Sequence, residues 1–291
     1  MVLFLLKLLS LLPLRLLHAC GRLFGRLLYY LPGRYRRRLR ANARQAGYTE
    51  AQFARAAAAQ SGAMVLEIPK VWFQTNKALT LCHNPDVHIV HEALAEQRGV
   101  LYLTPHLGCF EITARILVQH GPITVMYRPP RQAFLEPAMK LGRDLPGLHS
   151  VPANMRGVRE FMRALRRGEA VGMLPDQVPS GGEGVWADFF GKPAYTMILA
   201  ARLAQQAKVP IILTAGQRLP HGKGWQIHYV RVPEPYPTDL DDFVQNINYA
   251  MEDLIRRFPE QYLWSYNRYK IPADAPPIPP TLPSQRQQAG V

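Results

Sequence analysis

Residues 99–121, GVLYLTPHLGCFEITARILVQHG, combine an apolar run, a short polar turn and a helical pattern. The first part, GVLYL, is a short apolar run that predicts a buried strand. The last part, CFEITARILVQHG, predicts a helix that is stopped by Gly121 and Pro122. The turn between them carries His106. A strand that enters a helix through a short polar turn is the repeating unit of an α/β fold.

The same alternation continues through the rest of the chain. Three more apolar runs predict strands at residues 123–128, 170–177 and 209–216, and a fourth, at 225–232, alternates as an edge strand does. Helices are predicted around them at residues 50–68, 69–81, 157–169, 195–207 and 239–261. Strands and helices at this spacing indicate an α/β protein with a mostly parallel mixed sheet flanked by helices.

The positive charge of the chain is concentrated near its beginning. The whole sequence has 35 Lys and Arg against 21 Asp and Glu, a formal net charge of +14. Residues 1–44 hold ten of the basic residues and no acidic one, which leaves only 25 basic against 21 acidic residues elsewhere. We therefore expect this arm to meet an anionic surface.

The leucine content of the arm favours a membrane over a nucleic acid as that surface. At about 100° per residue, five side chains fall within an arc of roughly 100° on an otherwise apolar helix: Lys7, Arg15, His18, Arg22 and Arg26. Such a helix, kinked at Pro13, would lie in or slant through the interface with its arginines at the lipid phosphates. A spanning helix whose Lys7 and Arg15 reach toward the two interfaces is the alternative.

The chain is expected to have three segments. These are a basic hydrophobic membrane anchor at residues 1–45, an α/β domain at 46–270, and a tail at 271–291. The tail contains six prolines, so we expect it to be disordered or draped over the domain. The cysteines Cys20, Cys82 and Cys109 are scattered and odd in number, which favours a reducing compartment.

Several polar residues follow the predicted strands. His106, Arg128, Asp176 and Gln177 each lie where a strand ends. In an open α/β sheet, ligands bind beyond the carboxyl ends of the parallel strands. We therefore predict that these residues share one site.

His106 and Glu111 are the candidate acid–base pair. Five positions separate them, so the carboxylate can fold back toward the imidazole and fix its tautomer. The neighbouring Cys109 is the only candidate nucleophile, and nothing basic is placed to activate it. Such a pair suits activation of a substrate hydroxyl for direct attack on an acyl group. A helix-capping histidine beside a solvated glutamate is the alternative.

Residues 174–196 combine flexible glycines with bulky apolar side chains. We predict a loop in which Trp186, Phe189 and Phe190 line an acyl-chain slot and backbone N–H groups face an oxyanion. A structural lid with a core-facing pair of phenylalanines is the alternative. A rival metal site would use His83, Asp86, His88 and His91, but their spacing matches no recognised ligand set, so no metal is predicted.

Four blocks of the chain, in this order, resemble the late acyltransferases of lipid A biosynthesis, the lauroyl and myristoyl transferases, within the glycerolipid acyltransferase superfamily. HLGCFE at residues 106–111 matches the H-x4-E motif of that family. The others are MYRPPR at 126–131, RGVREFMRALRRGEAVGMLPDQ at 156–177 with VWADFFGKPAYT at 185–196, and PEQYLWSYNRYK at 259–270. With the N-terminal anchor, the resemblance covers most of residues 1–270.

The resemblance implies a glycerolipid-acyltransferase-like fold and a reaction without a cofactor. An acyl chain would move from the thioester of an acyl carrier protein to a hydroxyl of a lipid A precursor, at the cytoplasmic side of a bacterial inner membrane. His106 would be the general base and Glu111 would orient it. The acceptor would be held, or the pocket structured, by Arg128, Arg143, Asp176 and Gln177.

The same resemblance leaves the acceptor open. Related branches acylate other membrane lipids, so an ornithine lipid, a lysophospholipid or a glycolipid is an alternative acceptor. A non-catalytic protein that binds anionic lipid through its basic arm is a further alternative. No nucleic acid is expected as a partner.

Overall fold

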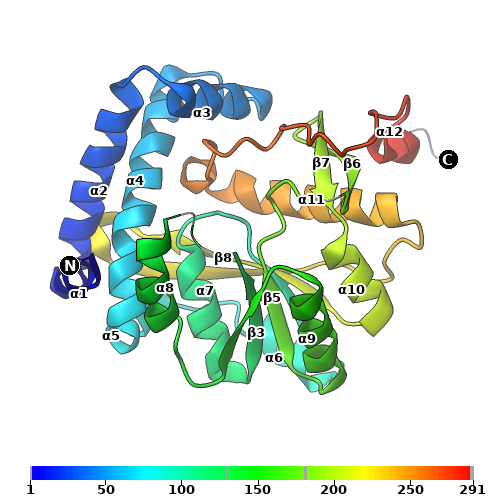
Figure 1. Cartoon of the computed structure of the whole chain (residues 1–291), viewed down its shortest axis with the longest axis horizontal. Helices are drawn as coiled ribbons and strands as arrows, with labels where there is room; N and C mark the ends of the chain where they lie inside the picture. Colours follow the sequence, from blue (N-terminus) through cyan, green and yellow to red (C-terminus); the bar gives the residue numbers. More distant parts are fainter. Residues whose placement is uncertain (1, 129, 131, 180–181, 289–291) are drawn as a thin grey trace.

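The computed structural model describes residues 2–128, 130, 132–179 and 182–288. Its centre is a seven-stranded sheet in the order β1-β9-β8-β2-β5-β3-β4, with a separate two-stranded hairpin, β6-β7 (Figure 1). Within the larger sheet, only the β8–β9 pairing is antiparallel among the described residues. The predicted α/β class with a mostly parallel mixed sheet is confirmed.

The strands are short, and several are buried on both faces, as strands of parallel sheets usually are. Their bounds are β1 Cys82–His83, β2 Val100–Leu103, β3 Ile123–Tyr127, β4 Leu148–Pro152, β5 Ala170–Met173, β6 Gly184–Phe189, β7 Lys192–Met197, β8 Ile211–Arg218 and β9 Trp225–Arg231.

Helices precede, connect and follow the strands. Their bounds are α1 Val2–Leu11, α2 Leu14–Tyr30, α3 Arg34–Gln45, α4 Ala51–Phe73, α5 Thr75–Leu79, α6 His88–Ala95, α7 Phe110–Leu117, α8 Glu136–Gly142, α9 Met155–Arg166, α10 Leu199–Ala207, α11 Leu240–Arg257 and α12 Pro283–Gln288.

The two faces of the sheet build two hydrophobic cores. Successive residues of β2 alternate between them, because side chains of a strand point to opposite faces. Leu101 and Leu103 pack with residues of α9, α10 and α11, whereas Val100 and Tyr102 pack with residues of α6 and α7. Helices therefore cover both faces, and the carboxyl ends of β2, β5, β3 and β4 lie along one edge.

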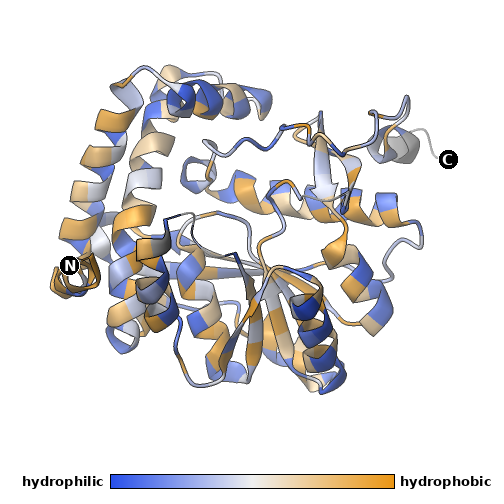
Figure 2. Ribbon diagram, in the orientation of Figure 1, coloured by the Kyte–Doolittle hydropathy of each residue, from blue (hydrophilic) through white to orange (hydrophobic). Residues whose placement is uncertain are grey.

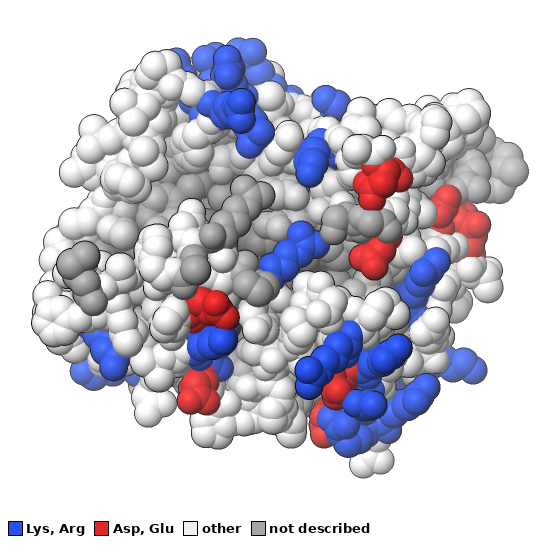
Figure 3. Space-filling view, in the orientation of Figure 1, with Lys and Arg blue, Asp and Glu red and all other residues white. Residues whose placement is uncertain are grey.

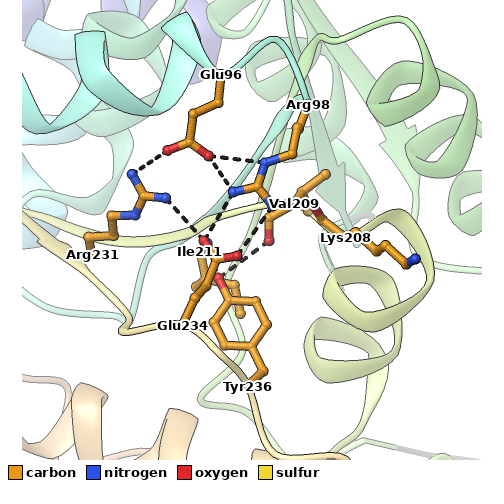
Figure 4. Close-up of polar contacts among 8 residues, drawn as sticks. All are labelled: Glu96, Arg98, Lys208, Val209, Ile211, Arg231, Glu234 and Tyr236. Carbon is orange, nitrogen blue, oxygen red and sulfur yellow. Dashed lines mark hydrogen bonds and ion pairs between the residues drawn. The ribbon is translucent and has the colours of Figure 1, made fainter.

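Ion pairs connect the segments at the opposite end of the strands, where β2 and β8 begin and the antiparallel β9 ends (Figure 4). Arg98, just before β2, contacts both Glu96 and Glu234, and Arg231 at the end of β9 contacts the same two carboxylates. The hydroxyl of Tyr236 accepts the N–H of Ile211 at 2.8 Å, at the start of β8. These partly exposed pairs fix the amino ends of the strands and leave the carboxyl ends for a site.

The N-terminal helices pack as part of the same body. α1 and α2 are separate helices around Pro13, so the predicted kink is confirmed. α2 runs along α4, and glycines form the closest contact: a Cβ on Gly21 would lie 2.6 Å from the carbonyl oxygen of Gly62. A Cβ on Gly62 or on Gly25 would likewise strike the backbone of the facing helix. Small residues permit this close approach, as they do between packed membrane helices.

α1 and α2 also carry many hydrophobic residues that do not pack on α4 (Figure 2) and are exposed. The large hydrophobic residues with at least half of their surface exposed there are Phe4, Leu8, Leu11, Leu23, Phe24, Leu27, Tyr30 and Leu31. We call this set the apolar face. None of the helices in the described part of the chain is both long enough and apolar enough to cross a membrane.

His18 lies on the inner side of α2, which corrects the prediction that it belongs to a lipid-facing stripe. It is fully buried, and its Nε2 lies 2.9 Å from the Glu67 carboxylate of α4. Glu67 also accepts hydrogen bonds from Arg218 and from the Trp225 indole. A buried carboxylate needs such partners, and these four hydrogen bonds from three side chains join α2 and α4 to the sheet.

Two predicted elements differ in the structure. Residues 50–68 and 69–81 were expected as two helices, but α4 continues through Pro69 to Phe73, since packing on both sides outweighs the lost hydrogen bond at the proline. The helix predicted at 195–207 begins only at Leu199. The residues before it belong to β7, because they pair with β6 around a turn in which Phe190 and Gly191 both have positive φ.

The described part of the predicted tail lies along this hairpin. The Trp186 indole donates to the carbonyl of Pro276 at 2.7 Å, and Ser284 contacts Asp188. Leu282 is buried with Trp186. Residues 271–288 are therefore draped over β6 and β7.

Candidate active site

The turn that carries His106 is held from three sides. Its position after β2 follows from pairing of β2 with β5 and β8. The carbonyl of His106 accepts the N–H of Leu263 at 3.0 Å, and the N–H of Gly108 reaches the carbonyl of Gln261 at 3.0 Å. Gly108 has a φ of 60°, and a Cβ there would strike the Gly216 carbonyl, so glycine is required at this position.

Asp176 is the carboxylate that binds the imidazole. Its Oδ1 lies 2.8 Å from Nδ1 of His106, and its Oδ2 accepts the backbone N–H of the same residue at 2.9 Å. Burial alone would raise the pKa of Asp176, but the histidine and its two hydrogen bonds hold that pKa below its usual value. An ionised carboxylate only accepts hydrogen bonds, so the proton of the neutral imidazole is on Nδ1.

The other ring nitrogen is turned toward Gln177. The side-chain amide nitrogen of Gln177 lies 3.1 Å from Nε2 of His106. With Nδ1 protonated, Nε2 is the acceptor of this hydrogen bond. The histidine therefore presents a proton-accepting nitrogen beside a group that a substrate hydroxyl can replace.

Glu111 is held by a different set of groups from the one predicted. Arg143 contacts Oε1, the Trp72 indole donates to Oε2 at 2.8 Å, and Arg115 lies 3.6 Å from Oε2. Burial would raise the pKa of Glu111, but the two guanidinium groups and these hydrogen bonds hold it below its ordinary value. Among the described residues, no hydrogen bond joins Glu111 to His106, because Asp176 occupies Nδ1 and Gln177 occupies Nε2.

A cavity of about 620 Å³ brings most of the predicted site residues together. His106, Glu111, Arg128, Arg143 and Gln177 all line it. Asp176 is buried behind the histidine. Pro129 and Arg131 of the MYRPPR block, and Ser180 and Gly181 of the predicted glycine-rich loop, lie outside the described residues.

The rest of the cavity wall is largely apolar. Five methionines, from β3, α8, the start of α9, β5 and β7, contribute to it: Met126, Met139, Met155, Met173 and Met197. Methionine side chains adapt to ligands of irregular shape. A smaller cavity of about 60 Å³ adjoins the larger one and shares Phe110, Met126 and Met173 with it. The site therefore has room for an apolar ligand beside His106.

The three aromatic residues predicted to line an acyl slot are elsewhere, which corrects that prediction. Trp186, Phe189 and Phe190 are buried in the core on the hairpin β6-β7. Phe190 packs against Trp264, and Trp186 against Tyr195. Successive side chains of β6 point to opposite faces, so Phe189 joins the core that contains residues of α11, whereas Trp186 is buried with Leu282 on the other face.

Three further residues belong to the site although sequence reasoning missed them. Trp72 comes from the end of α4, and Arg202 lines the cavity from α10. Arg115 is buried and bridges the carbonyl groups of Val71, Glu111 and Gly142. The sequence could have indicated Arg115, because it lies four positions after Glu111 on one predicted helix, a spacing at which the two side chains can pair. No local pattern indicates the other two.

Two alternative chemistries receive no structural support within the described residues. Burial raises the pKa of the Cys109 thiol well above its ordinary value, so the thiol is held protonated. No group of three or more His, Cys, Asp or Glu side chains within the described ranges is arranged to hold a metal ion. His91 instead packs its ring against that of His120.

The fold and the cavity define a class of protein: an α/β protein with a histidine–carboxylate pair at the strand ends, beside a cavity suited to an apolar chain. The chain belongs to the bacterial lipid A biosynthesis acyltransferase family, since the model of that family matches residues 1–271. It is accordingly an acyltransferase with a lipid A-type acceptor.

Three relatives are similar to this chain at low identity. The lipid A biosynthesis palmitoleoyltransferase of Escherichia coli strain K12 is 26% identical over 215 residues, covering 72% of this chain and 68% of the relative. The lauroyltransferase of the same organism is 26% identical over 194 residues, covering 65% and 61%. A lipid A biosynthesis acyltransferase of Haemophilus influenzae is 26% identical over 179 residues, covering 60% and 55%.

Proposed function

We propose that this protein transfers a fatty acyl chain from the thioester of an acyl carrier protein to a hydroxyl of a lipid A precursor, at the cytoplasmic face of a bacterial inner membrane. The observation that carries the proposal is the arrangement of His106, whose Nδ1 is held by Asp176 and whose Nε2 meets Gln177 at the cavity wall. Such a histidine is a general base for a hydroxyl group.

In the proposed reaction, Nε2 of His106 takes the proton of the acceptor hydroxyl as its oxygen attacks the thioester carbonyl carbon. A C–O bond forms, and the carbonyl becomes a tetrahedral oxyanion. Collapse of this intermediate breaks the C–S bond, and the proton passes from the imidazolium to the departing sulfur. An ester and a free thiol result, and the histidine returns to its neutral form without a covalent acyl–enzyme.

The surrounding residues have separate tasks in this proposal. Asp176, which touches the imidazole directly, orients the base and stabilises the imidazolium. Glu111 fixes Arg143, and Arg143 and Arg128 present guanidinium groups to phosphates of the acceptor. Gln177 can donate its amide N–H to the oxyanion once the hydroxyl has taken its place at Nε2.

The apolar face supports action at a membrane surface. Exposed apolar patches of this extent are uncommon on soluble monomers and mark interaction surfaces. α1 also contacts α8, where Leu141 is exposed and Met139 and Arg143 line the cavity. An interfacial position of α1 and α2 would thus bring lipid next to the cavity.

Transfer assays with purified protein in detergent test the mechanism. They use carrier protein charged with acyl chains of several lengths and a lipid A precursor as acceptor. His106→Ala should lower kcat by at least about 100-fold, the scale for loss of a general base, and Asp176→Asn should lower it similarly. Glu111→Gln should mainly raise the KM for the acceptor, because it releases Arg143. Asp144→Asn, an exposed carboxylate near the site, is the matched control.

The outcomes separate the alternatives. Full activity of His106→Ala would refute the proposal. A loss of kcat in Glu111→Gln with none in Asp176→Asn would return the orienting role to Glu111. Transfer to an ornithine lipid or a lysophospholipid, but not to the lipid A precursor, would change the acceptor. Vesicle binding without transfer to any acceptor would leave a non-catalytic lipid-binding protein.

A further inference from the structure

The outward side of α9, a helix whose first turn borders the cavity, carries a row of arginines. Arg156, Arg159, Arg163 and Arg166 recur at helical spacing and are exposed, and Arg167 follows directly. The opposite side of the helix, with Phe161 and Leu165, packs on the sheet. The row is therefore a solvent-facing surface.

This surface has an excess of positive charge. Residues 155–169 contain five arginines and two glutamates. Glu160 pairs with Arg163, and Glu169 pairs with Arg167. In the described part of the chain, no acidic side chain pairs with the remaining three: Arg156, Arg159 and Arg166.

The row is continuous with the active-site cavity. Asn154, Met155 and Val158, at the beginning of α9, line the cavity, as does the exposed Arg202 of α10. Met155 is 61% exposed and gives the rim an apolar contact point. A ligand arm that enters here reaches the cavity that contains His106.

A second basic surface lies over α3 and differs in its surroundings. Lys and Arg side chains gather over α3, at the top of the view, and over α9, at the lower right (Figure 3). α3 follows the apolar face directly in the chain, and its arginines suit lipid phosphates. On α9, Met155 is the only large hydrophobic residue that is exposed among those described. A charged surface with so little apolar area fits an acidic protein better than a bilayer.

We propose that the arginine row of α9, with Arg202 and Met155 at its cavity end, is the docking surface for the acidic carrier protein that brings the acyl thioester. The proposal rests on the proposed function, because it identifies the partner of the same cavity. Opposite charges would steer the carrier to this rim, and its thioester arm would enter between α9 and α10. The lipid acceptor would enter from the side of α1 and α8.

Triple charge reversal tests this surface in the full-length protein. Arg156→Glu/Arg159→Glu/Arg166→Glu should raise the KM for acylated carrier protein about 10- to 100-fold, with an unchanged kcat at saturation. The rate with an acyl-pantetheine thioester, which lacks the protein, should stay the same. Binding to vesicles that contain anionic lipid should also stay the same. Added salt should raise the carrier KM of the unmodified protein more than that of the variant.

Lys223→Glu/Arg257→Glu/Lys270→Glu makes the same change in net charge away from α9 and should leave the carrier KM within about twofold of the original. An α9 variant with an unchanged carrier KM would overturn the proposal. If the α9 variant lost only vesicle binding, α9 would be a membrane contact and the proposal would fail. The proposal would also fail if the variant lost activity equally with the acylated carrier protein and with the small thioester. If the unmodified protein uses the small thioester but not the carrier, the proposed function itself fails, and this is seen before any variant is tested.

Discussion

A variant of Cys109 can distinguish direct acyl transfer from a mechanism in which the acyl chain is first bound covalently to this cysteine. Its thiol lies three positions after His106, yet it is only 1% exposed and burial keeps it protonated. We predict that Cys109→Ala retains transfer activity within about twofold and that the protein forms no acyl adduct during turnover. Mass spectrometry of the intact protein during the reaction measures the adduct. A loss of 100-fold or more, or an acylated Cys109, would contradict direct transfer.

At the same scale, the sequence predicts which residues meet but not how they pair. His106, Arg128, Asp176 and Gln177 follow strands, and parallel strands bring their carboxyl ends together. The partner of the imidazole depends on strand order. β5 lies directly beside β2, so Asp176 reaches Nδ1, whereas α7 carries Glu111 toward Arg143 and Trp72. The order of the strands in the sheet cannot be read from a single sequence, so the partner of the imidazole could not be predicted.

The packing of α2 on α4 yields a prediction at the scale of secondary-structure elements. A Cβ on Gly62 would collide with the backbone of Gly21, so Gly62→Ala must push the helices apart. We expect a loss of about 1–3 kcal/mol in the free energy of unfolding, as for other overpacked contacts. Thermal unfolding followed by circular dichroism measures this.

Gly33→Ala is the matched control for that experiment. Gly33 has nothing within 4 Å of an added Cβ and an extended φ of 166°, so the control should unfold at nearly the same temperature as the original. Equal stability of the Gly62 and Gly33 variants would show that α2 does not pack closely on α4.

The bounds of two elements differ from the prediction because tertiary contacts outweigh the local sequence pattern. Two helices were predicted at residues 50–68 and 69–81, but α4 packs against α2 and continues through Pro69 to Phe73, which places Trp72 at the cavity. Likewise, the segment before Leu199 pairs with β6 as a strand. The predicted strands before His106 and Asp176 were correct, because a short apolar run bounded by a turn depends little on its neighbours.

For the whole molecule, the network around Glu67 joins the helices of the apolar face to the sheet that carries the site. His18 comes from α2, Glu67 from α4, Arg218 from β8 and Trp225 from β9. Arg218 and Gln261 exchange hydrogen bonds, and the carbonyl of Gln261 accepts the N–H of Gly108, next to the His106 turn. The apolar face and the turn that carries His106 are thus connected through one buried carboxylate.

This network should make the protein sensitive to acid. Burial would raise the pKa of Glu67, but Arg218 and His18 lower it from 4.5 to about 2. Its stabilising effect is complete above pH 4.5 and is lost as the pH falls toward 2, since only the unfolded chain then binds a proton. Burial also lowers the pKa of His18 from 6.5, so stability already declines as the pH falls below 6.5. Both groups act in the same direction.

We therefore predict that the melting temperature falls in two stages on acidification, first below about pH 6.5 and again below about pH 4.5. Glu67→Gln should make the second stage smaller, leaving the part that comes from Asp176 and Glu111, and should cost about 3–5 kcal/mol at pH 7, because it leaves the buried Arg218 without its counter-charge. Glu92→Gln, an exposed glutamate of α6, should change neither. Calorimetry from pH 3 to pH 8 measures these curves. If Glu67→Gln and the original protein lose stability in parallel below pH 4.5, another carboxylate is responsible for the acid transition.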